Sequence, residues 1–314
     1  MYKRTVLAIA SAVALAGLAA CSTPGSRQTS DTFASQFSFA MGSEEQTAPS
    51  ATYTQETQAP FDKYKNVIIY LNGNLKITRE YDSFGNLIKE KILGDSGYTN
   101  VYEYDIYGNL TKETKLGLEG LSQGGYEYEY DTAGNQISKT YIEPDGSCGN
   151  QHIYEYDADF NMIRDSEIIP GGIVCQKIEY EYDSHRNPVL QKQTGLDGES
   201  FEIRNEYEYD ASGNITKTTC YRAGEMSSRT EYEYNDSGLL TSEKFFRADG
   251  TPQSWSKYTY DNAGNMLSKT NLMEDGSVFQ RIEYGYDAQG NLLIETKYDS
   301  DGEIVQMYQY VYDG

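Results

Sequence analysis

The sequence predicts an all-β fold built from tandem antiparallel β-hairpins. Three observations support this: a recurring Tyr-Asp-x-x-Gly-Asn motif, an Asp-Gly turn signal between many of its copies, and intervening segments of about ten residues that alternate in character. Only 7 prolines occur in 314 residues, so little in these segments interrupts a sheet. We therefore expect roughly nine hairpins that form a curved or spiral sheet.

The motif is regularly spaced. Complete copies begin at Tyr81, Tyr104, Tyr130, Tyr209, Tyr260 and Tyr286, and degraded copies begin at Tyr156, Tyr182, Tyr234 and Tyr312. Successive copies are 23 to 27 residues apart, and most are 26 apart. A repeat of this length accommodates two strands and two turns.

Each motif residue suits a turn. An Asp at the first position of a type I turn accepts hydrogen bonds from the turn backbone, and a Gly three residues later adopts a positive φ. A type I turn followed by a left-handed Gly is a common hairpin connection. A turn of this bulged type places four pairs of residues opposite each other: Tyr104 and Leu110, Tyr209 and Ile215, Tyr260 and Met266, Tyr286 and Leu292.

The strand that enters each motif separates two kinds of side chain. In Tyr126-Glu127-Tyr128-Glu129-Tyr130 the alternation puts tyrosines on one face and glutamates on the other. Tyrosine is the dominant aromatic residue, with 30 against 10 Phe and 1 Trp. We expect one face of Tyr with aliphatic residues and one face of Glu with Thr, Ser and Lys.

This motif, with Asp-Gly between copies, resembles the YD repeats of the Rhs family over about residues 64–314. The resemblance implies hairpin repeats that coil into a β-sheet shell around toxin cargo or form part of cell-surface proteins. The repeat is longer than the family's usual one, and the family's Asp-Pro-x-Gly motif is missing from the sequence. We therefore expect an open sheet, whose last strand, 308–312, presents a free edge.

The first 62 residues differ from the rest. Lys3 and Arg4 precede a run of apolar and small residues, and Leu18-Ala19-Ala20-Cys21 resembles the lipobox of bacterial lipoproteins. We expect a signal peptide over 1–20, a lipidated flexible Ser/Thr/Gln-rich tether over 21–62 that begins at Cys21, and the repeat domain over 63–314. An ordinary secretory signal is the alternative. The expected location is the cell envelope, and the outer membrane in a Gram-negative host, because Ser22 follows the lipidated position.

Composition and motifs exclude several functions. The 48 acidic and 26 basic residues give a net charge of −22, which argues against nucleic-acid binding. The sequence contains 2 histidines and no nucleophile-elbow, zinc-protease or phosphate-loop motif. We therefore expect no enzymatic activity, no cofactor and no metal site.

The candidate ligand-binding residues are tyrosines two positions before the motif tyrosine. On neighbouring hairpins they stand about 10 Å apart, a spacing suited to stacking against sugar rings or peptide groups of a repetitive polymer. The alternative is that they pack on one another as the core of the sheet. They are Tyr102, Tyr128, Tyr154, Tyr180, Tyr207, Tyr232, Tyr258 and Tyr284.

Two cysteines stand about one repeat apart. Cys148 and Cys175 lie at similar places in adjacent hairpins, and export permits a disulfide between them. Their distances to the next motif tyrosine differ by one residue, so opposite faces are equally compatible with the sequence.

The predicted function is a cell-envelope lipoprotein that displays the array as a non-enzymatic binding module for carbohydrate or cell-wall polymer. The alternative is a structural or accessory scaffold of an Rhs-like toxin or contact system. Such a scaffold would bind a protein partner through exposed strand edges.

Overall fold

The computed structural model describes residues 66–313, which form twenty β-strands. The strands are β1 (Asn66–Leu71), β2 (Asn74–Tyr81), β3 (Leu87–Ile92), β4 (Tyr98–Tyr104), β5 (Leu110–Leu116), β6 (Ser122–Tyr130), β7 (Gln136–Ile142), β8 (Cys148–Tyr156), β9 (Met162–Ile169), β10 (Ile173–Tyr182), β11 (Pro188–Gly195), β12 (Ser200–Tyr209), β13 (Ile215–Arg222), β14 (Glu225–Tyr234), β15 (Leu240–Arg247), β16 (Pro252–Tyr260), β17 (Met266–Leu272), β18 (Val278–Tyr286), β19 (Leu292–Tyr298) and β20 (Ile304–Asp313). Across this range no helix is long and apolar enough to span a membrane.

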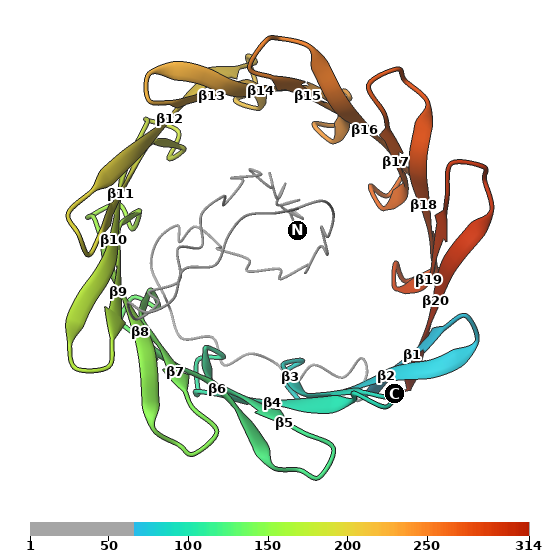
Figure 1. Cartoon of the computed structure of the whole chain (residues 1–314). Coiled ribbons are helices and arrows are strands. Elements are labelled where there is room, and N and C mark those ends of the chain that lie inside the picture. The colour runs from blue at the N-terminus through green and yellow to red at the C-terminus, as the bar shows by residue number, and fades with distance from the viewer. Residues whose placement is uncertain (1–65, 314) are drawn as a thin grey trace, which may run out of the picture. The chain divides into compact units, whose positions relative to one another are not determined.

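The sheet closes on itself. Every strand pairs antiparallel with the next, and β1 pairs antiparallel with β20, so that Ile68 lies opposite Val311 and Ile69 opposite Tyr310. The result is a 20-stranded barrel (Figure 1). The expected curved or spiral sheet of roughly nine hairpins is therefore wrong, because ten hairpins form a ring.

The first strand makes this closure possible. No YD motif precedes Asn66–Leu71, so the repeat pattern does not indicate that this segment completes the sheet. Val67 and Ile69 are nevertheless buried, with 6% and 2% of their surface exposed, and each pairs with both β2 and β20. Closure satisfies the backbone groups that an open sheet leaves unpaired at its edges. The edge expected to be free at 308–312 is thus occupied by β1.

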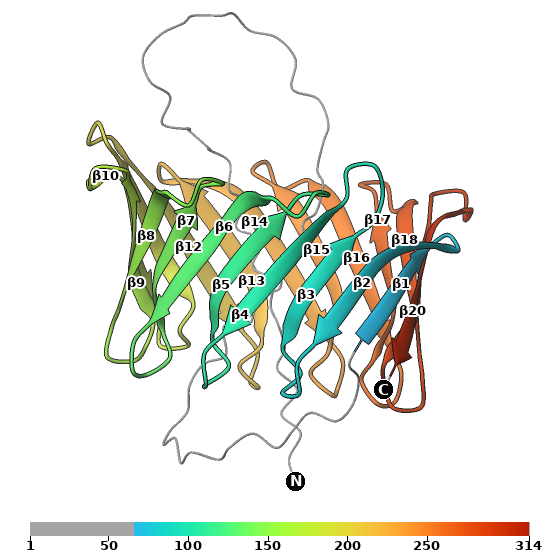
Figure 2. The ribbon, with the colours of Figure 1, turned by 90° about the horizontal axis from the view of Figure 1, so that it is seen from below.

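The two ends of the barrel carry different turns (Figure 2). Turns that follow even-numbered strands contain the YD motif and form what we call the YD end. Turns that follow odd-numbered strands form the distal end. In the YD turn after β4, the Asp105 N–H donates to Asn109 O at 2.9 Å, the Gly108 N–H donates to Asp105 O at 3.1 Å, and Gly108 has a φ of 85°. These bonds confirm the predicted type I turn with a left-handed Gly, and all four predicted opposite pairs are present.

A β-bulge near each YD turn decides which face later residues take. Tyr104 lies opposite Leu110 and Glu103 opposite Lys112, so Thr111 is an extra residue in β5. Beyond this bulge, Glu113 lies opposite Tyr102 and shares its face. The tyrosine face therefore carries charged residues that were not expected there.

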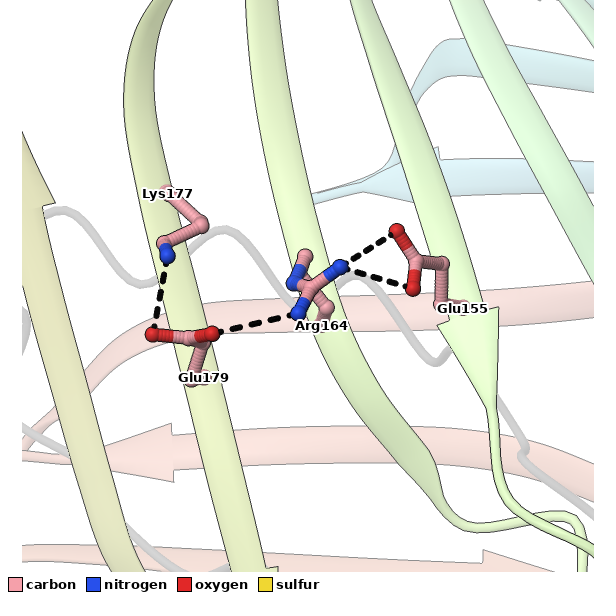
Figure 3. Close-up of polar contacts among 4 residues, drawn as sticks. All are labelled: Glu155, Arg164, Lys177 and Glu179. Carbon is pink, nitrogen blue, oxygen red and sulfur yellow. Dashed lines mark hydrogen bonds and ion pairs between the residues drawn. The ribbon is translucent and has the colours of Figure 1, made fainter.

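The glutamate face is the outer wall of the barrel. Figure 3 views β8, β9 and β10 with the opposite wall behind them, and Glu155, Arg164 and Glu179 lie on the near, outer surface. Strand side chains alternate between faces, so residues an even number of positions before a motif tyrosine point inward with it. Because a barrel of twenty strands is wider than its own side chains can fill, these tyrosines line a lumen.

Candidate functional site

The eight tyrosines predicted from the sequence form one row around the inner wall, which we call the inner belt. Each lies opposite a residue on the following strand, and those partners are Glu113, Lys139, Asp165, Gln191, Thr218, Glu243, Lys269 and Glu295 in chain order. Tyr310, opposite Ile69, belongs to the same row. The sequence-based set omitted Tyr310, although its position two residues before Tyr312 identifies it.

Phenols and carboxylates lie side by side in the inner belt. The Tyr128 hydroxyl donates to Glu113 Oε2 at 3.2 Å, and the Tyr258 hydroxyl donates to Glu243 Oε2 at 3.0 Å. An aromatic ring can stack against a sugar ring, and a neighbouring carboxylate accepts hydrogen bonds from sugar hydroxyls. The extra residue at each bulge moves the following side chains to the opposite face, and this places the carboxylates beside the tyrosines. The alternation of residues along one strand does not predict this placement.

Burial raises the pKa of several belt tyrosines. It raises the pKa of Tyr102, Tyr180, Tyr207 and Tyr284 to about 12. It also raises the pKa of Glu295, which lies opposite Tyr284. Phenols with such a pKa remain protonated at physiological pH and can donate hydrogen bonds to a ligand.

Aromatic rings are grouped around β6, β7 and β8. The Tyr126 and Tyr141 ring centroids are 5.4 Å apart, and Lys139 Nζ lies 4.6 Å from the Tyr126 centroid. On β8, the His152 and Tyr154 rings are stacked, with their centroids 6.1 Å apart. His152 Nδ1 is hydrogen-bonded to Asp165 Oδ1 at 2.8 Å, and this bond raises the pKa of His152.

The motif tyrosines form a second inner row nearer the YD end, and their hydroxyls are used by the fold. Eight of them donate to the backbone carbonyl of the first residue of the preceding strand, at 2.7 to 2.9 Å. Tyr260, for example, donates to Leu240 O at 2.7 Å. These hydroxyls connect neighbouring hairpins, so we assign this row to structure.

Tyr209 departs from that pattern. Its hydroxyl donates to Asp183 Oδ2 and accepts a hydrogen bond from Asn187 Nδ2 at 2.7 Å. The His185 ring stacks on the Tyr209 ring, with the ring centroids 4.1 Å apart. The spacing from the preceding motif is 27 residues here. The extra residue shifts the register of β12 against β11. As a result, the Tyr207 hydroxyl, and not that of Tyr209, donates to the carbonyl of Pro188, the first residue of β11, at 3.0 Å.

The structure does not join Cys148 and Cys175 by a disulfide. Cys148 begins β8 and is exposed, whereas Cys175 is buried in β10. Equivalent positions in adjacent hairpins are two strands apart, about 10 Å, because β9 lies between them. A disulfide needs Cα atoms about 4.4 to 6.8 Å apart.

The outer wall is rich in ion pairs. Lys112 Nζ lies 2.8 Å from Glu127 Oε1, and Lys217 Nζ lies 2.6 Å from Glu208 Oε1. Arg164 Nη1 contacts both Glu155 oxygens at 2.8 Å, and its Nη2 lies 3.3 Å from Glu179 (Figure 3). Lipid-facing barrel walls are apolar, and a Lys or Arg at mid-membrane depth costs about 2 to 4 kcal/mol. This wall is therefore suited to water.

The predicted signal peptide, the tether and Cys21 lie outside the described residues.

Solved structures with some similarity to this chain include two kinds of protein. The crystal structure of TcdB2-TccC3-Cdc42 is 12% identical with a TM-score of 0.23, and the match covers 74% of this chain and 17% of that one. A porin-like protein from Bacteroides uniformis is 12% identical with a TM-score of 0.35, over 80% and 98% of the two chains. A porin-like protein from Bacteroides vulgatus is 10% identical with a TM-score of 0.30, over 80% and 99%. At these scores the similarities carry no argument about function.

No curated protein matches the sequence. A family model described as "Uncharacterised protein" matches residues 149–309, which is just over half of the 314 residues. The chain belongs to that family.

Proposed function

We propose that this protein is an exported, lipid-anchored binding protein of the cell envelope, and that the inner belt binds carbohydrate or cell-wall polymer without catalysis. One observation carries the proposal: half-buried neutral phenols recur around the inner wall beside carboxylates, as in the Tyr128–Glu113 and Tyr258–Glu243 pairs. Polyhydroxylated rings suit such a surface because they offer both a face for stacking and donors for the carboxylates.

The charges of the belt favour a neutral polymer over an anionic one. Glu113, Asp165, Glu243 and Glu295 face the lumen, and the belt cations Lys139 and Lys269 lie 5.8 and 5.5 Å from the rings of Tyr128 and Tyr258. An anionic chain would meet these carboxylates in a protein of net charge −22.

The envelope location is proposed from residues 1–22 alone. A lipidated Cys21 would supply the attachment, since a strongly acidic protein is repelled by anionic membrane surfaces.

The test is binding of the full-length protein to a panel of glycans and peptidoglycan fragments. We expect saturable binding that weakens about tenfold for Tyr128→Ala and for Tyr258→Ala, which corresponds to about 1.4 kcal/mol per aromatic contact. Two outer-wall tyrosines provide matched controls, because Tyr221 donates to Glu206 at 2.9 Å and Tyr298 donates to Glu283 at 3.0 Å. Their alanine variants should bind normally. Absence of binding across the panel by a folded protein, or equal loss from both walls, would refute the proposal.

The alternative of a scaffold that binds a protein partner needs a surface other than the strand edges, because β1 and β20 pair with each other.

A further inference from the structure

Exposed apolar side chains occur at several distal turns, and six of them belong to the three successive turns beside the seam. All six are exposed and lie in or directly after the turns between β1 and β2, β17 and β18, and β19 and β20: Leu75, Met273, Val278, Phe279, Ile304 and Val305. The pairing of β20 with β1 places the β1–β2 turn next to the β19–β20 turn, and the pairing of β18 with β19 places the β17–β18 turn on the other side of it (Figure 2). We call these six residues the distal patch.

The fold does not require apolar residues at these positions. The two residues that follow the Asp-Gly-x turn begin the next strand, and they are Val278-Phe279 in β18 and Ile304-Val305 in β20, but Cys148-Gly149 in β8 and Pro252-Gln253 in β16. Phe279 and Ile304 are 58% and 57% exposed. A cluster of exposed apolar residues on a folded protein marks an interaction surface.

Carboxylates flank the distal patch on two of its three turns. Glu274 and Asp275 are exposed between β17 and β18, and Asp301 and Glu303 are exposed between β19 and β20. Arg247 reaches one of them, with its Nη1 3.2 Å from Glu274 Oε2. Acidic groups around an apolar surface complement a partner that carries Lys or Arg beside its apolar residues. The same charges oppose an anionic bilayer and would repel the identical patch of a second copy.

We propose that the distal patch docks a basic amphipathic segment of another protein. The apolar face of that segment packs on Phe279, Ile304 and their neighbours, and its cations meet the flanking carboxylates. This inference concerns the outside of one end of the barrel and is independent of the ligand of the inner belt.

The test measures fluorescence anisotropy of a labelled amphipathic helical peptide of Leu and Lys, titrated with the full-length protein. The double variant Phe279→Ser/Ile304→Ser should bind at least tenfold more weakly. The control Ile106→Ser/Tyr107→Ser removes residues that are 90% and 70% exposed at the YD end, and it should bind as the wild type does. Neither variant changes the charge. A second distal variant, Val278→Ser/Val305→Ser, should reproduce the loss, and urea unfolding checks that all variants are folded.

Several results would overturn the proposal. Equal binding by the distal variants and the YD-end control would remove the distal patch from the site. Equal binding of a peptide with Ser in place of Leu would show that charge alone attracts the peptide. Sedimentation with vesicles of anionic lipid, or concentration-dependent dimerisation, that disappears in the distal variants would assign the patch to a membrane or to a second copy.

Discussion

The seam between β1 and β20 decides whether the sheet is a barrel, and a disulfide across it tests that directly. Ile68 and Val311 lie opposite each other, and both point to the outer wall, since Val311 immediately precedes Tyr312. Opposite residues of antiparallel strands have Cα atoms about 4.5 to 5.5 Å apart, which is within the range of a disulfide. The variant Ile68→Cys/Val311→Cys should therefore oxidise within one molecule.

The expected stabilisation is large because the bond closes a long loop. The two positions are about 240 residues apart, and the chain-entropy relation gives about 5 kcal/mol as an upper value. With a urea m-value of about 2.5 kcal/mol/M, the unfolding midpoint should rise by up to about 2 M. A reductant should abolish the increase. The assay is urea unfolding with and without reductant, with the bond located by mass spectrometry of a digest.

A control variant places the second cysteine elsewhere on the outer wall. Val101 precedes Tyr104 by three residues on β4, three strand spacings from β1, or about 14 Å. Ile68→Cys/Val101→Cys should not form an intramolecular bond. If the seam variant also stays reduced, or gives only disulfide-linked dimers, the sheet is not closed and the reasoning fails.

Three further predictions test the rows of side chains and the anchor. Tyr260→Phe removes a hydroxyl that donates to a backbone carbonyl and should lower the free energy of unfolding by about 1 kcal/mol. Tyr221→Phe on the outer wall should have a smaller effect. Equal losses in urea unfolding would contradict the structural role of the motif tyrosines. The hydrogen bond to Asp165 raises the pKa of His152 in the folded protein. The protonated histidine therefore stabilises the fold fully below the unfolded-state pKa of about 6.5, and this stabilisation is lost as the pH rises through the folded-state pKa. His152→Gln should therefore destabilise the protein at about pH 5.5 and have little effect at about pH 8.5, and a loss independent of pH would show that the ion pair is not responsible. Cys21→Ala should abolish metabolic labelling with palmitate; an equally labelled variant would place the lipid on another residue, and an unlabelled wild type would indicate an ordinary signal.

The sequence alone predicts the local parts of this structure well. Asp and Gly in Tyr104-Asp105-Ile106-Tyr107-Gly108 specify a type I turn with a left-handed Gly, because few residue types satisfy that backbone. The opposite pair Tyr104 and Leu110 follows from the turn geometry. The strand period of two separates Tyr128 from Glu129, so the row of belt tyrosines is also predictable.

Other features depend on interactions between distant parts of the chain. Closure brings Ile68 to Val311, and nothing in a single repeat encodes the small rotation of each hairpin that adds up to a full circle. The same rotation makes the tyrosine face the inside, which places Tyr128 in a lumen wall and Glu155 on the outer wall. The bulges bring Glu113 to the tyrosine face, and the intervening strand β9 separates Cys148 from Cys175. The sequence thus determined the turns, strands and faces, which depend on neighbouring residues, whereas only the tertiary structure decided closure and which face is inside, because these depend on the accumulated geometry of all twenty strands.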